Sequence, residues 1–174
     1  CWATPARPAI ELRVTGPLPV PPQPPAPEDA PSCAEAGVPA RIEFATKPAL
    51  ATAMILGAFD AAFPFGWVAG DEVYGADPDL RTTLQDRQIG YVLAIGCDRR
   101  ISTEAGLHPV SDLAAALPES TWQALSAGAG AKGPRMYSWA WIATTETPKV
   151  GSCSVLIRRN DATGEVAYYR CYSP

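Results

Sequence analysis

A continuous apolar run from Tyr91 to Cys97 limits the folds open to this chain more than any other segment. Runs of this length without alternation are typical of strands buried on both faces, as in a parallel sheet. A shorter apolar run, Trp67 to Ala69, ends just before Asp71. A helix-like segment precedes each run, and this alternation of helix and strand predicts an α/β layer architecture.

Two helices are predicted by the residues that begin them. Thr46 is a good N-cap, and Pro48 falls in the first turn, where a missing amide donor costs nothing. The segment that follows is apolar on nearly every face, so we expect this helix to be covered on both sides. Asp77 and Pro78 begin the second helix, which is predicted to continue to about Gln88.

The chain beyond Cys97 is predicted to be mainly antiparallel β-structure. Short helices are expected first, at 111–117 and at 119–126, followed by a glycine-rich loop. Three strand-like segments come next: Met136 to Thr144, Ser152 to Arg159 and Glu165 to Tyr172. The sequence NDATG between the last two is a good hairpin connection. This half therefore resembles a β-rich insertion attached to the α/β part.

Residues 1–31 have a different composition, since they hold ten of the nineteen prolines. Proline removes amide donors and favours extended backbone, which predicts a linker or loose arm rather than core. Such an arm suits an aromatic groove on a partner, although a passive linker is the simpler interpretation. The predicted division is a Pro-rich linker or unrelated upstream segment at 1–31, an α/β part at 32–100 and a β-rich insertion at 101–174.

Asp71 is the main candidate for a functional residue. Ligands of parallel α/β sheets gather outside the carboxyl ends of the strands, which is where Asp71 is expected. Its oxygens suit Mg²⁺, a hard cation that binds few protein carboxylates and keeps several waters. Glu72 is not expected to be the second ligand, because neighbouring strand residues point to opposite faces. The spacing equally allows Asp71 to cap a turn before Tyr74 and Gly75.

Basic residues are the candidates for contacts with a polyanion. The glycine-rich segment 128–135 is not a P-loop, since no strand leads directly into it and no Ser or Thr follows Lys132. Lys132 and Arg135 suit a phosphate backbone as point and fork charges, and a flexible connector is the simpler alternative. Two further pairs allow either phosphate contacts or solvated edge charges: Arg158 with Arg159, and Arg99 with Arg100.

The overall charge excludes some classes of function. A net charge of −4 is not the signature of a protein that binds nucleic acid over its whole surface. Residues 1–90 hold 6 Lys/Arg and 11 Asp/Glu, whereas residues 91–174 hold 8 and 7, so any polyanion contact is favoured in the second half. No apolar run approaches the ~20 residues of a membrane span.

Other reactive or aromatic residues are given structural interpretations. The five cysteines are widely spaced and form no CxxC pair, which argues against a zinc site or a disulfide framework. His108 is the only histidine, and it has no nucleophile in a recognised context, so a catalytic triad has little support. Trp139 and Trp141 alternate on one strand face and are interpreted as core rather than as a base-stacking platform.

Several segments together carry a family resemblance. They are CAEAGVPARIEFATKPALATAMI, WVAGDEVYGADPDLRTTL, GYVLAI, WQALSAGAGAKGPRMYSWAW and VLIRRNDATGEVAYYRCYSP. In this order, from Cys33 to Pro174, they resemble consecutive blocks of DDE-type bacterial insertion-sequence transposases, which are RNase H-like proteins. The sequences GDEVYG and SAGAGAKGPR are the most specific of these blocks. Residues 1–27 show no such match.

The resemblance implies an α/β fold of the RNase H-like type and an active site of two aspartates and a glutamate that binds magnesium. Asp71 matches the second aspartate. Such enzymes cut DNA at transposon ends by water attack, and the freed 3′-hydroxyl then attacks target DNA. Two metal ions ~3.5–4 Å apart activate the nucleophile and stabilise the leaving oxygen. Residues 32–100 then correspond to a partial catalytic core, and 101–174 to the insertion that such proteins place before the glutamate.

The same resemblance implies that the active site is incomplete here. The first aspartate belongs on an earlier strand, which the Pro-rich arm is not expected to provide, and the glutamate belongs on a helix after the insertion. We therefore expect this chain to be the middle part of a transposase, with one of the three catalytic carboxylates. Such a part is expected to be inactive alone, so the sequence does not decide whether the chain is an enzyme. The implied partners are transposon-end and target DNA, with a homo-oligomer for the intact enzyme, acting at the nucleoid in the cytoplasm.

Two other classes of function are considered beside this one, and the first of them is compatible with it. The first is a non-catalytic remnant that binds DNA or a full-length partner through Lys132, Arg135, Arg158 and Arg159. The second is a secreted lipoprotein, because the sequence starts at Cys1 and continues into a Pro-rich tether. The transposase-like blocks argue against the lipoprotein, and salt-dependent DNA binding would support the remnant.

Overall fold

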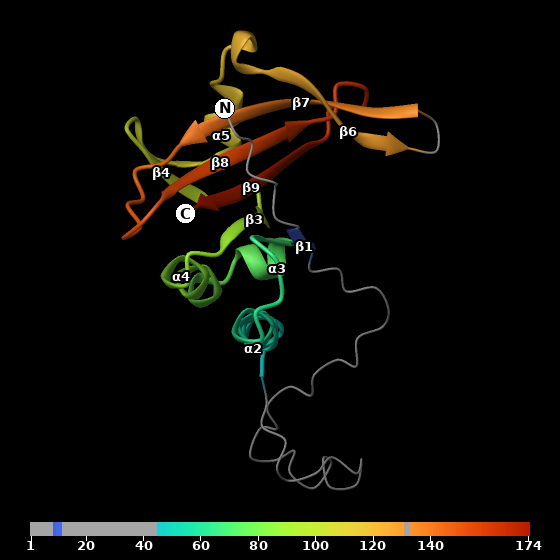
Figure 1. Ribbon diagram of the computed structural model, residues 1–174. Coiled ribbons are helices and arrows are strands. Elements are labelled where there is room, and N and C mark those ends of the chain that lie inside the picture. The colour runs from blue at the N-terminus through green and yellow to red at the C-terminus, as the bar shows by residue number, and fades with distance from the viewer. Residues whose placement is uncertain (1–8, 12–44, 131–132) are drawn as a thin grey trace, which may run out of the picture.

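The structure, a computed structural model, describes residues 9–11, 45–130 and 133–174. Its centre is a seven-stranded sheet with the strand order β1-β2-β3-β9-β8-β7-β6, and β4 and β5 form a separate two-stranded sheet (Figure 1). The strands are β1 (Ala9–Glu11), β2 (Trp67–Gly70), β3 (Gly90–Ile95), β4 (Arg100–Thr103), β5 (Gly106–Pro109), β6 (Gln123–Gly130), β7 (Gly133–Ala143), β8 (Ser152–Arg159) and β9 (Val166–Ser173). The helices are α2 (Lys47–Asp60), α3 (Glu72–Gly75), α4 (Pro78–Asp86), α5 (Val110–Ala115) and the 3₁₀ turn η1 (Glu119–Thr121).

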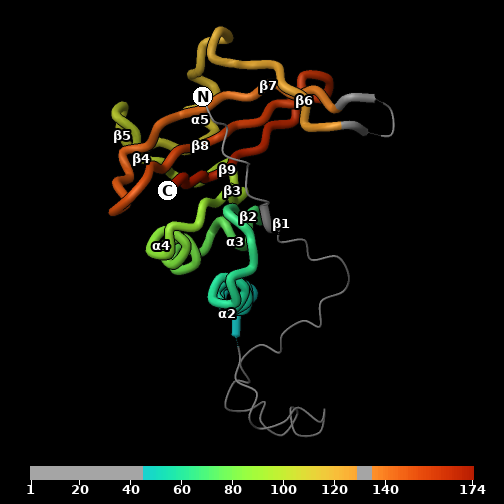
Figure 2. Tube along the Cα trace, in the orientation of Figure 1, coloured from blue at the N-terminus to red at the C-terminus, as the bar shows by residue number. Residues whose placement is uncertain are grey.

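The large sheet is parallel on one side of β3 and antiparallel on the other. β1 pairs with β2 and β2 pairs with β3 in parallel, whereas β9 runs antiparallel to β3. The β6–β7 hairpin extends from one end of the molecule, and the β4–β5 hairpin lies at the other (Figure 2). The predicted α/β class with an antiparallel β-rich second half is therefore confirmed, and the sheet is continuous across residue 100.

The predicted element starts agree well with the structure. The Thr46 hydroxyl accepts a hydrogen bond from the amide of Ala49 at 3.3 Å and begins α2, and Asp77 Oδ1 accepts from the amide of Leu80 at 2.8 Å and begins α4. The three predicted strands in the second half are β7, β8 and β9, and residues 160–165, which include the predicted hairpin connection 160–164, join the last two. At these positions, capping residues and turn residues were sufficient to predict where each element begins or ends.

Both buried apolar clusters lie against one face of the sheet. Tyr91 of β3 lies opposite Tyr172 of β9, which in turn lies opposite Cys153 of β8, and directly opposed residues share a face. Helices α2 and α4 cover this face near β2 and β3, through residues such as Ile55 and Leu80. Helix α5 and strand β4 contribute to the second cluster, near β7 and β8.

The expectation that β3 is buried on both faces is wrong. Tyr91, Leu93 and Ile95 are almost fully buried, but Val92 and Ala94 between them are only half-buried. An uninterrupted apolar run does not by itself show how many faces are covered. Here β3 pairs with an antiparallel strand on one side, and antiparallel sheets commonly leave one face open.

The expectation that α2 is covered on both sides is also wrong. Ala51 and Ile55 are buried, whereas Leu50, Met54 and Phe59 are exposed, Met54 to 72%. The helix therefore packs along one narrow stripe. Its remaining apolar side chains form an exposed apolar surface on the helix.

Two further predictions are corrected by the strands. Residues 119–126 form one 3₁₀ turn and the start of β6 instead of a helix, because residues from Gln123 onward pair with β7. Residues 1–31 were expected to provide no strand, yet β1 pairs in parallel with β2. The apolar alternation of Ile10, Leu12 and Val14, in a stretch free of proline, was the signal for it.

Candidate active site

Asp71 lies directly between β2 and α3, at the carboxyl end of β2. Its Oδ1 accepts a hydrogen bond from the amide of Val73 at 3.0 Å, and its carbonyl accepts from the amides of Tyr74 and Gly75. Asp71 is thus the N-cap of α3, so the capping role allowed by the sequence is present. The side chain is exposed, and no hydrogen bond between described residues uses its second oxygen. A role as a metal ligand remains a prediction.

Close packing fixes α3, and with it Asp71, against β3. A Cβ added at Gly75 would overlap the carbonyl oxygen of Ala94 in β3, and one added at Gly70 would lie 3.0 Å from the side chain of Leu93. The backbone contact requires glycine at position 75, whereas at position 70 the side chain of Leu93 would have to shift by a few tenths of an ångström. The backbone that carries Asp71 is therefore held against the sheet rather than in a free loop.

Two other carboxylates lie at the same edge of the sheet. β3 runs parallel to β2, so the residues after β3 emerge next to Asp71. A Cβ added at Gly96 would lie 2.8 Å from Asp98 Oδ1 and 3.7 Å from Glu72 Oε2, which places both carboxylates beside Gly96. Asp98 was not among the residues predicted from the sequence, although the rule that selected Asp71, an acid just after a buried strand, applies to it as well.

These donors suit a hard cation but do not complete a metal site. Mg²⁺ usually binds through one or two carboxylates, with water and substrate phosphates as its other ligands. Within the described ranges, no three His, Cys, Asp or Glu side chains gather in a way that could hold a metal ion. The edge therefore offers carboxylate oxygens of the kind that Mg²⁺ prefers.

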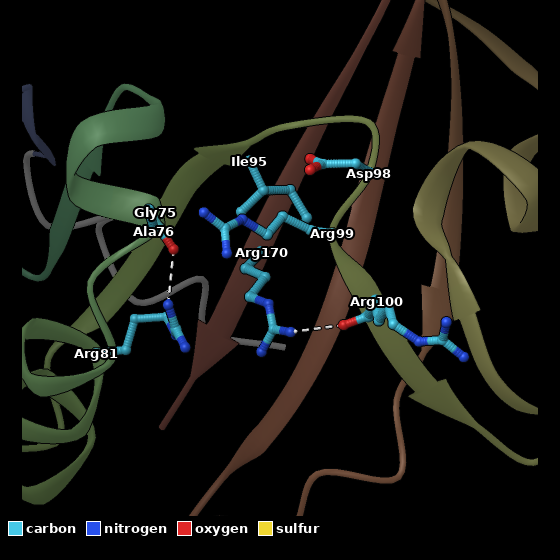
Figure 3. Close-up of a pocket in the computed structure, with 8 residues that line it drawn as sticks. All are labelled: Gly75, Ala76, Arg81, Ile95, Asp98, Arg99, Arg100 and Arg170. Carbon is cyan, nitrogen blue, oxygen red and sulfur yellow. Dashed lines mark hydrogen bonds between the residues drawn. The ribbon is translucent and has the colours of Figure 1, made fainter.

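A basic cavity of about 330 Å³ opens next to this edge (Figure 3). It is lined by Gly75 at the end of α3, by Ala76 directly after it, and by arginines from three parts of the chain: Arg81, Arg99 and Arg170. The sequence analysis considered Arg99 for phosphate contact but not the other two. Nothing local to α4 or β9 indicates that they meet here, since the pairing of β9 with β3 brings them together.

The predicted DNA contacts are not gathered in one place. Lys132 lies outside the described residues, and Arg135 is exposed near the start of β7. Arg158 lies 4.8 Å from the ring centroid of Tyr137 and forms a 3.8 Å ion pair with Glu165. Arg158 is therefore already engaged within the protein.

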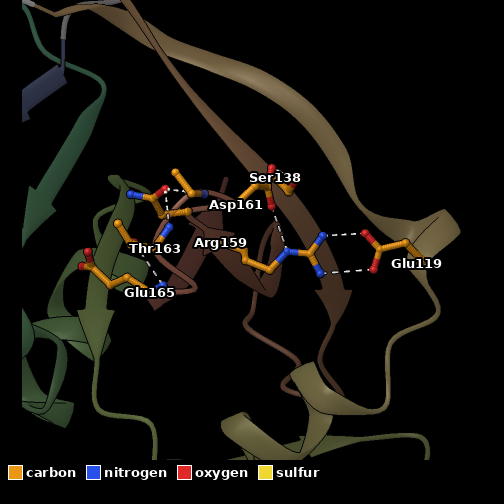
Figure 4. Close-up of polar contacts among 8 residues, drawn as sticks. Glu119, Ser138, Arg159, Asp161, Thr163 and Glu165 are labelled. Carbon is orange, nitrogen blue, oxygen red and sulfur yellow. Dashed lines mark hydrogen bonds and ion pairs between the residues drawn. The ribbon is translucent and has the colours of Figure 1, made fainter. Parts of the chain in front are cut away.

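Arg159 is held more firmly, in a network that joins β8, η1 and the hairpin after β8 (Figure 4). Its guanidinium donates to both carboxylate oxygens of Glu119, at 2.5 and 3.2 Å, and its Nε donates to Asp161 Oδ1 at 3.0 Å. The guanidinium also stacks over Trp122, 4.3 Å from the ring centroid. This set of partners gives Arg159 a structural role.

The network shifts the acidity of its carboxylates. Hydrogen bonds from Arg159 lower the pKa of Glu119. The pKa of Asp161 is lowered first by the hydrogen bond from buried Ser138 (Oγ to Oδ2, 2.6 Å) and then by Arg159. Both groups are therefore stabilised as anions in the folded protein.

The histidine and the two tryptophans considered in the sequence are the remaining residues to place. His108 lies on β5, with its Nε2 3.0 Å from the carbonyl oxygen of Ala105. The interpretation of both tryptophans as core is wrong for Trp141, which is 59% exposed on the open face of the sheet. Trp139 is half-buried beside it, and both line a shallow cavity of about 290 Å³.

Comparison with known proteins identifies one family. The model of a family described as DDE superfamily endonuclease matches residues 5–116, which is more than half of the chain. The expectation that residues 1–27 show no resemblance is therefore wrong, and the match includes β1. The α/β structure is consistent with a partial RNase H-like fold of this superfamily. No curated protein matches the chain. No helix within the described ranges is long and apolar enough to cross a membrane.

Proposed function

The chain belongs to the DDE superfamily of endonucleases, and we propose that it serves metal-dependent cleavage and strand transfer of DNA in transposition, with Asp71 as a metal-ligating residue. The superfamily gives the coarser function, that of a transposase-like nuclease acting on DNA, and its members generally use divalent metal ions. The observation that carries the proposal is the position of Asp71 at the carboxyl end of a parallel strand. Ligands of α/β sheets gather at that edge.

Asp71 would hold the metal through the oxygen that α3 does not use. Glu72 and Asp98 lie close enough to this edge to take part, directly or through water. When bound, a divalent ion there supplies Lewis-acid activation of water and of the scissile phosphate. The contribution of the protein is a fixed carboxylate, because Gly75 and Gly70 hold α3 against β3.

We propose further that this chain alone does not cleave DNA. The support is that the described residues bring no three candidate metal ligands together. Completion of the site would require carboxylates from other residues. Some parts of the proposal rest on sequence alone. These are insertion-sequence transposition, magnesium as the metal, a homo-oligomeric intact enzyme, action at the nucleoid in the cytoplasm, and the division of the chain at residues 31 and 100.

The test is a nicking assay with supercoiled plasmid and Mg²⁺ or Mn²⁺, on the wild-type chain and on Asp71→Asn. We expect no metal-dependent nicking by either protein. Nicking by the wild type that Asp71→Asn abolishes would show that the chain is active alone and would confirm Asp71 in the site. Nicking that survives the substitution would refute the role of Asp71.

A second candidate function is DNA binding without catalysis. The observation that favours it is Arg135, which is exposed near the β6–β7 hairpin and can reach a phosphate backbone. Arg158 and Arg159 would have to leave their protein partners to contribute. Salt-dependent binding of a DNA duplex that Arg135→Gln weakens would support this function, and binding unchanged by that substitution would oppose it.

A further inference from the structure

The arginine cavity at the end of α3 contains a charged side chain in a place where a sheet normally carries core residues. Arg170 of β9 pairs with Leu93 of β3 on one side and with Val155 of β8 on the other. Both of those neighbours are completely buried. Arg170 therefore lies on the covered face of the sheet, between the two apolar clusters, and its side chain is only 17% exposed.

Burial of a cation at this position requires strong compensation. Arg170 Nη1 forms an ion pair with Glu146 Oε1 at 2.5 Å. Its Nη2 donates to the carbonyl oxygen of Arg100 at 3.2 Å, as Figure 3 shows. These two partners hold the guanidinium in a fixed orientation at the cavity. Arg100 contributes only its backbone, because its own guanidinium donates to the carbonyl oxygen of Leu107 and points away from the cavity.

A second arginine adds like charge rather than compensation. Arg81 Nη1 donates to the carbonyl oxygens of Gly75 and Asp77, at 2.7 and 3.2 Å, which fixes its guanidinium at the cavity. Burial lowers the pKa of Arg81, and the charge of Arg170 lowers it further. Glu146, the ion-pair partner of Arg170, and Asp77 act on this pKa in the opposite direction. One carboxylate therefore already lies near both guanidinium groups, and a further anion would balance the positive charge that remains at the cavity.

Arg99 supplies the accessible donors. It is exposed, and the contacts between described residues include no ion pair or side-chain hydrogen bond for it. Figure 3 shows its guanidinium directed over the cavity toward the end of α3. Asp98, one of the carboxylates near the carboxyl ends of β2 and β3, lines the same cavity.

We propose that this cavity binds a phosphate group of the DNA backbone, held by the guanidinium groups of Arg81, Arg99 and Arg170. The guanidinium fork matches two phosphate oxygens at once, and three forks from separate elements suit a tetrahedral group. A phosphate here would lie beside Asp98, which lines the cavity and is one of the carboxylates near the carboxyl ends of β2 and β3. The inference rests on the proposed function for the source of the phosphate, and the same chemistry would accept free inorganic phosphate.

The first arm of the test uses inorganic phosphate with the full chain. Amide ¹H–¹⁵N shifts are followed as sodium phosphate is added, with sodium chloride at matched ionic strength as the blank. We expect saturable shifts at Gly75, Ala76 and Asp98 that chloride does not produce. Arg99→Gln should weaken this binding about tenfold, since it removes one charge-assisted fork. Arg87→Gln, the same change in an arginine that pairs with Asp60 outside the cavity, should leave it unchanged.

The second arm uses a fluorescein-labelled DNA duplex and measures its affinity over a range of salt concentrations. Arg99→Gln should reduce the slope of log affinity against log salt by about one, as expected for one lost phosphate contact, and Arg87→Gln should not. The duplex should compete with inorganic phosphate for the shifted amides. The variant Arg99→Lys, which keeps the charge without the fork, should lie between the wild type and Arg99→Gln in affinity.

The outcomes separate the two proposals. The absence of saturable shifts, or equal shifts in Arg99→Gln, overturns the phosphate site even if the duplex still binds elsewhere. Phosphate binding at the cavity together with duplex binding that Arg99→Gln does not alter overturns the DNA backbone as the source. Phosphate binding at the cavity with no duplex binding at all supports the site and counts instead against the proposed function.

Discussion

The contact between Gly75 and β3 gives the sharpest prediction about how the candidate site is held. A Cβ at this position would overlap the carbonyl oxygen of Ala94, a backbone atom in the middle of the large sheet. Since β3 is hydrogen-bonded on both sides, α3 has to move instead. Overpacking of this kind costs ~1–3 kcal/mol, and we place Gly75→Ala near ~3 kcal/mol because the obstacle is backbone rather than a flexible side chain.

Gly57 provides a matched control, because the same substitution there is expected to raise the stability of the protein. It lies inside α2, and a Cβ added there would meet nothing within 4 Å. Gly57→Ala should therefore stabilise the protein by ~0.5–1 kcal/mol, the usual gain for alanine over glycine in a helix. The two variants make the same chemical change and differ only in the space available to the added methyl group.

The measurement is thermal and urea unfolding of both variants beside the wild type. A change of 1 kcal/mol moves the Tm of a protein of this size by ~2–4 °C, so Gly75→Ala should unfold ~6–12 °C lower. Gly57→Ala should unfold slightly higher than the wild type. If Gly75→Ala matches the wild type, or follows Gly57→Ala, then α3 is not packed against β3 as described and the position of Asp71 loses its support.

Two further predictions concern charged side chains. Because the folded-state pKa values of Glu119 and Asp161 are lowered, their stabilising contribution is present above their unfolded pKa values of about 4 and is lost as the pH falls through the folded values. Urea midpoints at pH 7 and pH 3 should therefore differ less in Arg159→Gln than in the wild type or in Arg87→Gln, and an undiminished difference would contradict this assignment. Asp71→Ala should cost ~0.5–1 kcal/mol through loss of the α3 cap, whereas Asp71→Asn, which can still accept from Val73, should cost less. Equal losses for the two variants in urea unfolding would show that the cap is not the cause.

The elements that could be predicted from the sequence are those with a local signal. Thr46 with Pro48, and Asp77 with Pro78, mark their helices by side-chain capping, which depends on only a few neighbouring residues. Residues 160–164 mark a hairpin for the same reason. The position of Asp71 at a strand end followed from the apolar run before it, and its capping role was one of two interpretations that the spacing allowed.

Features that depend on distant pairing could not be predicted in this way. Residues 119–126 have helix-like composition, but pairing with β7 makes the second half of this segment a strand. The arginine cavity forms only because β9 lies next to β3, which places Arg170 near Arg81 and Arg99. Asp98 was within reach of sequence reasoning, because it follows β3 as Asp71 follows β2, and the rule was applied to only one of the two strands.

The central claim is that a DDE endonuclease binds its metal ion at the carboxyl ends of β2 and β3. The most direct test of this claim is Mn²⁺ titration of the ¹⁵N-labelled chain. Paramagnetic broadening shows where the ion resides without any need for catalysis. We predict broadening centred on Asp71, Glu72 and Asp98 in the wild type, and its loss in Asp71→Asn, which should keep the α3 cap and the fold. Broadening centred on another part of the chain, or unchanged in Asp71→Asn, would contradict the account.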